Sequence, residues 1–486
     1  MLGFVNSLMV RRYLTLVTGL FECLCFSGAV FGWASLVFIL KTEGYFSSLC
    51  VSTTGVNATQ VLDCSGQDEQ FSLVFTIASF LFSFLMLPNS VLFDRFGTTV
   101  ARLFGITLYT TGTLMMAFST AALSNLMFPA LALMASGGNM FLLTNLQLGI
   151  LFGSHRSTVI TLYNGSIGSS SALFLVIKLL HEAGIFFLPS FLFLSACSVL
   201  HLLRTFFLLP RGKIPHPLPD GYTCGITCSK SKTLSLEQIT AEGNNQPTTE
   251  EVKDVPVDQE KSLRECLKSR LFWWHLLWLS VMLLRHYLYI GTLNPMLQRL
   301  TDGDPSLVSR YTDAFAITQL CGVLCAPWNG LIFDRNKGKP SAEGESEQEA
   351  DLRASVLSLF LTALQCVLFS VCACIPSLPL QYFTFVLEVI NRSFLFGGNA
   401  AFINVAFPLC HFAKLYGLVL ALSSVFSLLQ YACFALVNGP LHGDPLYVNI
   451  GVTLLTLLAF IHPLSVFLHC RSLASQRAIS ASSKCL

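Results

Sequence analysis

Long apolar runs, separated by short polar segments, make up most of this sequence. A helix needs about 20 mostly apolar residues to cross a bilayer, whereas the strands of a transmembrane barrel are about ten residues long and alternate in polarity. The runs are long and do not alternate, so the pattern predicts an all-α membrane protein. Twelve membrane-spanning helices are expected, at roughly 13–40, 71–93, 99–121, 125–152, 158–180, 185–209, 271–293, 311–333, 354–375, 379–407, 415–437 and 446–468.

The composition of the 486 residues leads to the same class of protein. Hydrophobic residues make up 53% and charged residues only 12%, which is about half the charged fraction of a typical soluble domain. A soluble protein of this size needs a more polar surface, which excludes an ordinary cytosolic enzyme, and a disordered chain is excluded as well. The net charge of +2 gives no support for binding nucleic acid.

Lysine and arginine predict the orientation, because they accumulate in cytoplasmic loops. With twelve spans, one face of the membrane carries far more of them than the other, and both termini then lie in the cytoplasm. The predicted outer face holds Lys41, Lys178, Arg299 and Arg310, and the predicted inner face holds Arg95, Arg102, Arg156, Arg211, Lys213, Arg264, Lys268, Arg270, Arg335, Lys337, Lys339, Arg353, Lys414 and Arg471.

The first outer loop, residues 41–70, carries two signals of the extracellular side. Asn57 begins an Asn-Ala-Thr sequon, which is glycosylated only outside the cytoplasm. Cys50 and Cys64 are the two cysteines on the oxidising face, where they can form a disulfide.

A polar stretch at 210–270 divides the chain. It is rich in proline, lysine, glutamate and threonine, and we expect a cytoplasmic linker that is disordered in its middle. It separates an N-terminal six-helix half, 1–209, from a C-terminal six-helix half, 271–470. A cytoplasmic tail, 471–486, follows.

The sequence Phe-Asp-Arg ends both the second and the eighth predicted span, 240 residues apart. The first copy contains Asp94 and Arg95, with Arg102 shortly after, and the second contains Asp334 and Arg335. Such groups can form a conformational latch at the cytoplasmic side, in which the aspartate accepts from arginines or from the N-terminus of a neighbouring helix. Alternatively, they serve only to anchor the topology.

Parallel six-helix halves are typical of one class of transporters. The Asp-Arg loop is similar to the G-x-x-x-D-R-x-G-[RK] motif of the major facilitator superfamily, although Ser90 stands where the first glycine is usual and the second copy loses the pattern after Arg335. Within that superfamily the chain resembles solute carrier family 43 over nearly its whole length, apart from the linker and the tail. The segments that carry this resemblance are Arg156-Ser157-Thr158-Val159-Ile160-Thr161-Leu162-Tyr163-Asn164-Gly165, Leu209-Pro210-Arg211-Gly212-Lys213-Ile214-Pro215, Ile290-Gly291-Thr292-Leu293-Asn294 and Ala326-Pro327-Trp328-Asn329-Gly330.

The resemblance implies facilitative, sodium-independent transport across the plasma membrane by alternating access, without a cofactor and without an obligate protein partner. The chain is most similar to members that carry purine nucleobases such as adenine, guanine and hypoxanthine, and the other members carry large neutral amino acids. In one place the sequence departs from the family. Relatives often have an acidic residue in the fifth span where Gly168 stands, so any role of that acid is absent here or has moved.

Ionisable side chains inside the predicted spans are the best candidates for a substrate site, since each costs several kcal/mol in hydrocarbon unless it faces a cavity or a partner. Glu22 lies in the first span, Arg285 and His286 in the seventh, and Glu388 and Arg392 in the tenth. In the superfamily that the chain resembles, these helices tend to line the central cavity. Further candidates at similar depth are Asn145, Tyr163, Asn164, Tyr289 and Asn399.

Each charged candidate also has a structural interpretation. Glu388 and Arg392, four residues apart, can pair along one helix face. Glu22 can brace a helix interface, with Arg285 or Arg392 as its partner. Arg285 and His286 are adjacent and point about 100° apart on a helix, so both cannot face one point.

Two substrate classes fit these residues. A purine is flat and can stack on an aromatic ring, while arginine donates to its N7 and O6 and amides or carboxylates pair with its other edges. A zwitterionic amino acid needs a cation for its carboxylate and an anion or carbonyls for its amine, which Arg392 or Arg285 together with Glu22 could supply. The residues alone leave the two classes nearly equal, and the resemblance favours nucleobases.

Enzymes and receptors are the remaining classes. The ten histidines are scattered without metal-ligand spacing, and neither a nucleophile motif nor a phosphate-binding loop is visible. We therefore expect neither an enzyme nor a metal site. A scaffold or receptor without transport stays open, as does proton coupling through Glu22 or His286.

Overall fold

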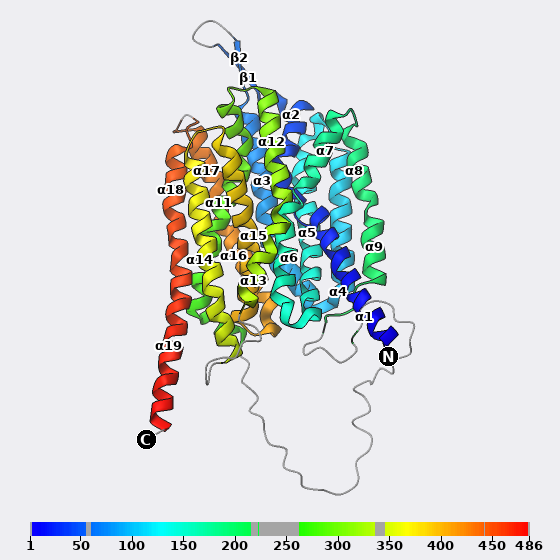
Figure 1. The fold of residues 1–486 in the computed structure, drawn as a ribbon. Coiled ribbons are helices and arrows are strands. Elements are labelled where there is room, and N and C mark those ends of the chain that lie inside the picture. The colour runs from blue at the N-terminus through cyan, green and yellow to red at the C-terminus, as the bar shows by residue number, and fades with distance from the viewer. Residues whose placement is uncertain are drawn as a thin grey trace.

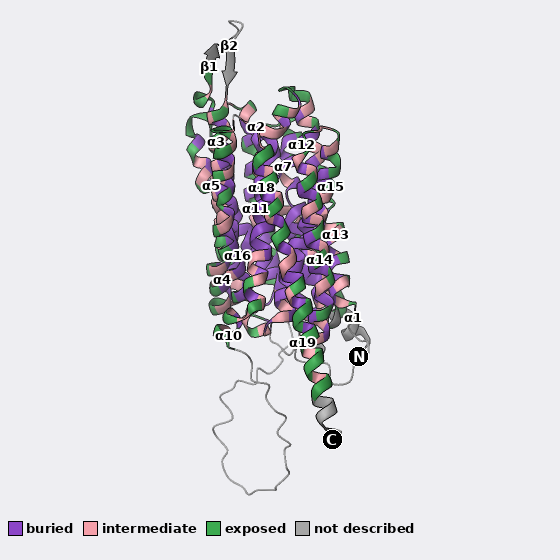
Figure 2. Ribbon diagram, turned by 90° about the vertical axis from the view of Figure 1, so that its left-hand side faces the viewer, coloured by how far each residue is buried: buried purple, intermediate pink, exposed green. Residues whose placement is uncertain are grey.

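The structure, a computed structural model, describes residues 2–54, 60–214, 222, 262–335, 346–441 and 443–484. Within these ranges most residues are helical, as the apolar runs predict, and the helices form one bundle (Figure 1). Buried residues fill the bundle along its length, while exposed residues lie on its outer surface (Figure 2). We call residues 2–214 the first half and residues 262–484 the second half.

The helices have the following bounds. In the first half they are α1 (Leu2–Glu22), α2 (Trp33–Thr42), α3 (Ser65–Phe84), α4 (Met86–Ala117), α5 (Met127–Leu146), α6 (Arg156–Ser169), α7 (Ala172–Glu182), α8 (Phe187–Ala196) and α9 (Ser198–Phe207). In the second half they are α10 (Leu263–Lys268), α11 (Arg270–Leu300), α12 (Pro305–Leu320), α13 (Gly322–Asp334), α14 (Glu347–Cys374), α15 (Leu380–Ala406), α16 (Phe412–Ser427), α17 (Leu429–Asn438), α18 (Leu446–Thr456) and α19 (Ile461–Lys484). Tighter or wider turns join some of them, namely the π-helix η1 (Cys23–Ser27) and the 3-10 helices η2 (Ala29–Gly32), η3 (Ser47–Leu49), η4 (Ala121–Leu126), η5 (Gln147–His155), η6 (Leu409–His411) and η7 (Leu457–Phe460).

Nine helical stretches of the described chain are long and apolar enough to cross a membrane, or ten if the bent pair Met9–Ser27 and Ala29–Thr42 is one span. The stretch Ser65–Ala117 has 53 residues. At 1.5 Å per residue this is far longer than one crossing of about 30 Å. Gly97, whose φ is 77°, breaks it, since only glycine adopts that conformation readily. The count of twelve spans stays a prediction, and each predicted run is largely helical.

Helices occur at both ends of the second half, where the sequence predicted a polar linker and a tail. The short helix α10 lies inside the predicted linker 210–270, most of which falls outside the described residues, as does Asn57. α19 continues to Lys484 through most of the predicted tail 471–486, because neither glycine nor proline interrupts the chain after Pro463.

A β-hairpin projects from the end of the bundle that we call the outer end. Its strands β1 (Val51–Thr54) and β2 (Gln60–Asp63) pair antiparallel, and a disulfide joins Cys50 to Cys64 beside them. α1 begins and α19 ends at the opposite, inner end (Figure 1). Both ends of the described chain thus lie on one side, while the assignment of that side to the cytoplasm rests on the charge pattern.

Candidate functional site

A buried arginine with unused hydrogen-bond donors lies between the two halves. Arg392, near the middle of α15, is 2% exposed, yet its Nε and both terminal nitrogens have no hydrogen-bond partner. Glu388 lies at the limit of an ion pair with it, with 3.9 Å between Nη1 and Oε1. A guanidinium at membrane depth is costly unless its donors are used. These donors therefore indicate a place where a ligand can bind.

Aromatic rings from both halves surround this guanidinium. Arg392 Cζ lies 4.1 Å from the ring centroid of Phe31 and 5.9 Å from that of Phe396. The Phe31 ring also stacks with Tyr287, at 5.6 Å between centroids, and Tyr287 Oη is 2.8 Å from Ser83 Oγ. Flat rings with a cation beside them suit a flat, polar ligand.

Three spans are broken beside this site. The first span passes from a π-helix to a 3-10 helix at Gly28, whose N–H donates to Ser170 Oγ at 2.7 Å. Ser170 itself lies between α6 and α7. Its neighbour Ser169 accepts from the N–H of Val323 at 2.8 Å, next to the break between α12 and α13. Helices broken at mid-membrane depth are tolerated where protein or a cavity satisfies their backbone, and they are typical of transporter sites.

Gly168 lies directly beside the arginine. A Cβ atom at Gly168 would lie 3.6 Å from both Arg392 Cδ and Gln319 Oε1. Gln319 Nε2 donates to Glu388 Oε2, while Glu388 Oε1 is 3.1 Å from His286 Nδ1. Both carboxylate oxygens of Glu388 thus have partners, which agrees with a structural role. Arg392, a donor, and the Gln319 amide oxygen, an acceptor, therefore both lie against Gly168.

Glu22 and Asn145 belong to a separate polar group inside the first half, which we call the Glu22 cluster. Glu22 pairs with Arg102 of α4 and, at 2.7 Å, with Arg204 of α9. His201 Nδ1 lies 2.7 Å from Glu22 Oε1. Asn145 donates to Glu22 at 2.9 Å and accepts from Arg204 at 2.7 Å. The Glu22 carboxylate is surrounded by donors of its own half, so it braces a helix interface. Its arginine partners are Arg102 and Arg204, where Arg285 or Arg392 was expected.

The two candidates of the Tyr-Asn-Gly segment point in different directions. The Tyr163 hydroxyl donates to the Leu16 carbonyl oxygen at 3.3 Å, within the first half. Asn164 Oδ1 accepts from the Tyr416 hydroxyl at 2.8 Å. Asn164 therefore joins the halves, whereas Tyr163 contacts α1.

Asn399 lies in a corresponding polar group of the second half, the His275 cluster. Asn399 Oδ1 is 2.9 Å from His275 Nε2, and His275 Nδ1 is 3.1 Å from His462 Nε2. These residues come from the seventh, tenth and twelfth predicted spans, and the Glu22 cluster uses the first, fourth and sixth, together with the third. Each half thus buries a polar group on corresponding helices, as an internal repeat predicts.

Arg285 and Tyr289 point into the second half. Arg285 Nη1 donates to Asn449 of α18 at 2.8 Å, and the Tyr289 hydroxyl donates to Gln381 Oε1 at 3.3 Å. His286, next in sequence to Arg285, points instead toward α15. Adjacent residues on a helix therefore serve different interfaces, as their angular separation predicts.

The two Asp-Arg copies have different partners at the inner end. Asp334 accepts from the Thr158 N–H at 3.1 Å and from its hydroxyl at 2.7 Å. This contact caps the first turn of α6 and joins the halves. Asp94 forms an ion pair with Lys213, within the first half.

The arginines expected in the latch lie elsewhere. Arg95 and Arg335 are exposed. Arg102 is fully buried and belongs to the Glu22 cluster rather than to the inner loop. The helix that resumes after Gly97 carries Arg102 about 8 Å into the bundle, at 1.5 Å per residue.

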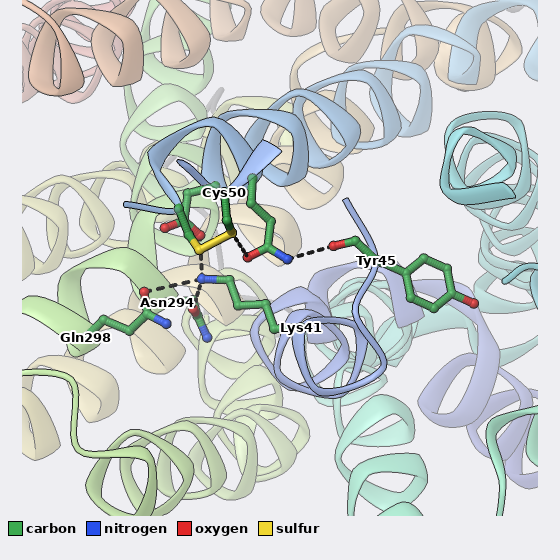
Figure 3. The surroundings of a disulfide bond; sticks show 8 residues. Lys41, Tyr45, Cys50, Asn294 and Gln298 are labelled. Carbon is green, nitrogen blue, oxygen red and sulfur yellow. Dashed lines mark hydrogen bonds and ion pairs between the residues drawn. A yellow bond between two sulfur atoms is a disulfide. The ribbon is translucent and has the colours of Figure 1, made fainter. Parts of the chain in front are cut away.

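Two lysines join the halves at the outer end. Lys41, at the end of α2, donates to Asn294 and Gln298 of α11, at 3.2 Å each (Figure 3). Lys178 of α7 pairs with Asp313 of α12 at 2.6 Å and is fully buried. Lys178 therefore does more than set the topology, which is the role the charge count gave it.

Some of these groups could not be singled out from the sequence, and others could. Phe31 and Tyr287 are two of many aromatic residues that look alike in composition. Arg204 is a charge inside a predicted span, the same signal that identifies Arg392, and could have been found. Among the residues that the structure describes, no three His, Cys, Asp or Glu side chains are grouped so as to hold a metal ion.

Comparison with known proteins places the chain in a family. The model of the Major Facilitator Superfamily matches residues 23–430. The chain belongs to this superfamily. It is 51% identical to equilibrative nucleobase transporter 1 of Bos taurus, with 96% of this chain and 98% of that protein covered. It is 33% identical to large neutral amino acids transporter small subunit 3 of Homo sapiens, over 94% and 93% of the two chains. The family predicted from the motifs is thereby confirmed.

Two solved structures of distantly related sequence share the fold of this chain. The crystal structure of the human organic anion transporter MFSD10 (TETRAN) has a TM-score of 0.53 and 14% identity, and covers 92% of this chain and 99% of that one. A bacterial homologue of the iron transporter ferroportin, in its outward-facing state, has a TM-score of 0.50 at 14% identity, over 93% and 99% of the two chains. At this identity the likeness shows the fold alone.

Proposed function

We propose that this member of the superfamily is a facilitative, sodium-independent transporter of purine nucleobases such as adenine, guanine and hypoxanthine, in the plasma membrane. The observation that carries the proposal is Arg392, whose buried donors are unpartnered and whose guanidinium lies against the Phe31 ring. The relative that is 51% identical is an equilibrative nucleobase transporter, which supports the same substrate class.

A purine suits the groups beside Gly168. Arginine can donate to the N7 and O6 acceptors of guanine or hypoxanthine and to N7 of adenine. The Gln319 amide oxygen, which also lies beside Gly168, can accept from a ring or exocyclic N–H. Stacking on an aromatic ring such as Phe31 adds about 1–3 kcal/mol for each base.

Large neutral amino acids are the second candidate, because one relative transports them by name. Their carboxylate would suit Arg392, but their ammonium group needs an acceptor, best an anion. The buried carboxylates of Glu22 and Glu388 each have both oxygens engaged. An ammonium group would have to displace one of those partners, and this favours a neutral ring.

Transport would follow from rocking of the halves about Arg392. Lys41 and Lys178 join the halves at the outer end, and Asp334 joins them to Thr158 at the inner end. Opening one set of contacts while the other holds exposes the site to one side at a time. The substrate gradient is then the only driving force.

Uptake of radiolabelled adenine into cells that express the chain tests this proposal. Guanine, hypoxanthine, leucine and phenylalanine are added in excess as competitors, and sodium is replaced by choline in parallel. We expect guanine and hypoxanthine to compete, sodium replacement to leave the rate unchanged, and the internal concentration to stop at the external one.

Three results would overturn parts of the proposal. Competition by leucine without competition by guanine would assign the site to amino acids. Accumulation above the outside concentration that collapses with the proton gradient would replace facilitated diffusion by proton coupling. The lack of any solute flux at a normal surface level would leave a scaffold or receptor.

A further inference from the structure

A second cavity lies on the outside of the second half, between α14 and α19. Its volume is about 650 Å³, and it is lined by the first part of α14, by η7, by α19 and by Arg335 after α13. This volume falls within the range of small-molecule sites, about 300–1,000 Å³. The cavity shares no lining residue with the Arg392 site.

Both long walls of this cavity are apolar toward mid-membrane and basic toward the inner end. On α14, Arg353 and Phe360 are seven residues apart, and on α19, Phe467 and Arg471 are four apart, so each pair lies on one helix face. Phe360 and Phe467 are 43% and 49% exposed. Exposed rings at this depth face the hydrocarbon of the bilayer.

Arginines dominate the inner end of the cavity. Among the described lining residues there are four arginines against the single acid Glu349. Glu349 pairs with Arg477 at 2.7 Å, and Arg477 Nε is buried without a hydrogen-bond partner. Arg335 and Arg471 are exposed, and neither forms an ion pair with another described residue.

We propose that this cavity binds one anionic glycerophospholipid of the inner leaflet. The phosphate-bearing headgroup lies among the arginines, and the acyl chains run along Phe360 and Phe467. The positive-inside rule assigns this end of the bundle to the cytoplasm, whose leaflet holds the anionic lipids. A soluble anion would leave the apolar walls uncovered, and a zwitterionic lipid would bring no net negative charge to Arg335 and Arg471. One anionic lipid satisfies both features.

Native mass spectrometry of the purified full chain tests the proposal. The protein is incubated in detergent with equal amounts of palmitoyl-oleoyl phosphatidylserine and chain-deuterated phosphatidylcholine with the same acyl chains, and the bound lipids are counted by mass. We expect the first bound lipid to be phosphatidylserine in about tenfold excess. Arg471→Gln combined with Arg477→Gln is expected to remove most of that preference.

Two further variants distinguish lipid binding in the cavity from general attraction by basic residues at the inner end. Arg264→Gln with Arg270→Gln removes the same charge at the inner end outside the cavity, and should leave the preference unchanged. Ala474→Trp fills the cavity without changing its charge, and should remove most of the retention of the first lipid. Thermal unfolding without added lipid checks that every variant is folded.

The proposal is overturned if the wild-type chain retains both lipids equally. It is also overturned if the phosphatidylserine preference survives in the double arginine variant of the cavity, or if Ala474→Trp retains the first lipid as well as the wild type does. The measurement counts bound lipids, so its outcome is independent of which solute the protein transports.

Discussion

At the scale of single residues, Arg392 is the group on which the substrate site depends. Arg392→Ala removes its donors, while Glu388 keeps its contacts with His286 and Gln319. A hydrogen bond to a charged group contributes about 1.5–3 kcal/mol, so adenine uptake should fall roughly 10- to 100-fold. Arg392→Lys keeps the charge without the planar fork and should be intermediate. Uptake is normalised to surface protein, and a normal rate for the alanine variant at a normal surface level would exclude Arg392 from the site.

Gly168 allows a test of the surroundings of Arg392. Gly168→Glu would place a carboxylate against the guanidinium and occupy its donors, so adenine uptake should be lost. Gly168→Ala is the matched control, because its Cβ would be in ordinary van der Waals contact with its nearest neighbours at 3.6 Å. Both variants are measured at equal surface level. Unimpaired uptake by the glutamate variant would show that the substrate binds elsewhere.

Glu22 is expected to matter for stability rather than for substrate binding. Glu22→Gln leaves Arg102 and Arg204 buried without their counter-charge, which typically costs 3–5 kcal/mol. Glu43→Gln serves as the control, since Glu43 is 43% exposed in its pair with His181, and such pairs contribute about 1 kcal/mol or less. Thermal unfolding of the purified variants measures the difference. Equal unfolding temperatures would contradict the bracing role.

Which residues carry charge at depth could be predicted from the sequence, but their roles could not. Glu22 and Arg392 are alike in sequence, since each is a charge that interrupts an apolar run. In the structure Glu22 is surrounded by donors, whereas Arg392 has none of its donors used. The difference depends on how each helix is rotated and on the side chains of distant spans. The hydropathy pattern of one sequence predicts neither the rotation of a helix nor its neighbours in other spans.

At the scale of helices, the break at Gly28 is expected to be essential for packing. A Cβ atom there would lie 2.4 Å from the Ile167 carbonyl oxygen, so Gly28→Ala must push α6 away from the first span. We expect poor folding and a low surface level. Gly451→Ala is the control, because a Cβ atom at Gly451 meets nothing within 4 Å. Surface biotinylation compares the two variants, and an equal level for both would contradict this role of the break.

The spans themselves could be predicted closely, and their breaks could not. Length and apolarity define a membrane helix, because each crossing needs about 20 apolar residues. The breaks at Gly28, Ser170 and Cys321 leave this pattern unchanged, since each lies inside a run that is apolar over most of its length. Serine side chains of a neighbouring span satisfy some of the freed backbone groups. That compensation depends on tertiary contacts.

At the scale of the whole molecule, buried polar groups fall into two kinds. The Glu22 and His275 clusters each lie inside one half and can move with it as a rigid part. Arg392, Lys178 and Asp334 contact the opposite half, so their contacts change when the halves rock. The repeated Asp-Arg sequence predicts two halves, but residues of both kinds occur at the same depth, so the sequence does not separate them.

The pair of Lys178 and Asp313 offers a test of alternating access. Asp313→Asn removes one charge from this outer contact, while Lys178 keeps Glu182 at 3.0 Å. Weakening the contact should favour the state that is open to the outside. Substrate added outside then meets the competent state more often, so the half-saturating adenine concentration for uptake should fall.

The Asp313→Asn variant also tests whether the adenine gradient is the only driving force of transport. A facilitator of a neutral solute has no energy source other than the gradient, so a change in the protein alters how fast the two sides equalise and not where they stop. Cells with Asp313→Asn should therefore reach the wild-type internal adenine level at a different rate. Asp444→Asn, in an exposed pair with Arg299 within the second half, should change neither quantity. If the final internal adenine level differs between Asp313→Asn and the wild type, transport is coupled to a second gradient. If the half-saturating concentration is unchanged, the Lys178 contact does not close the outer end.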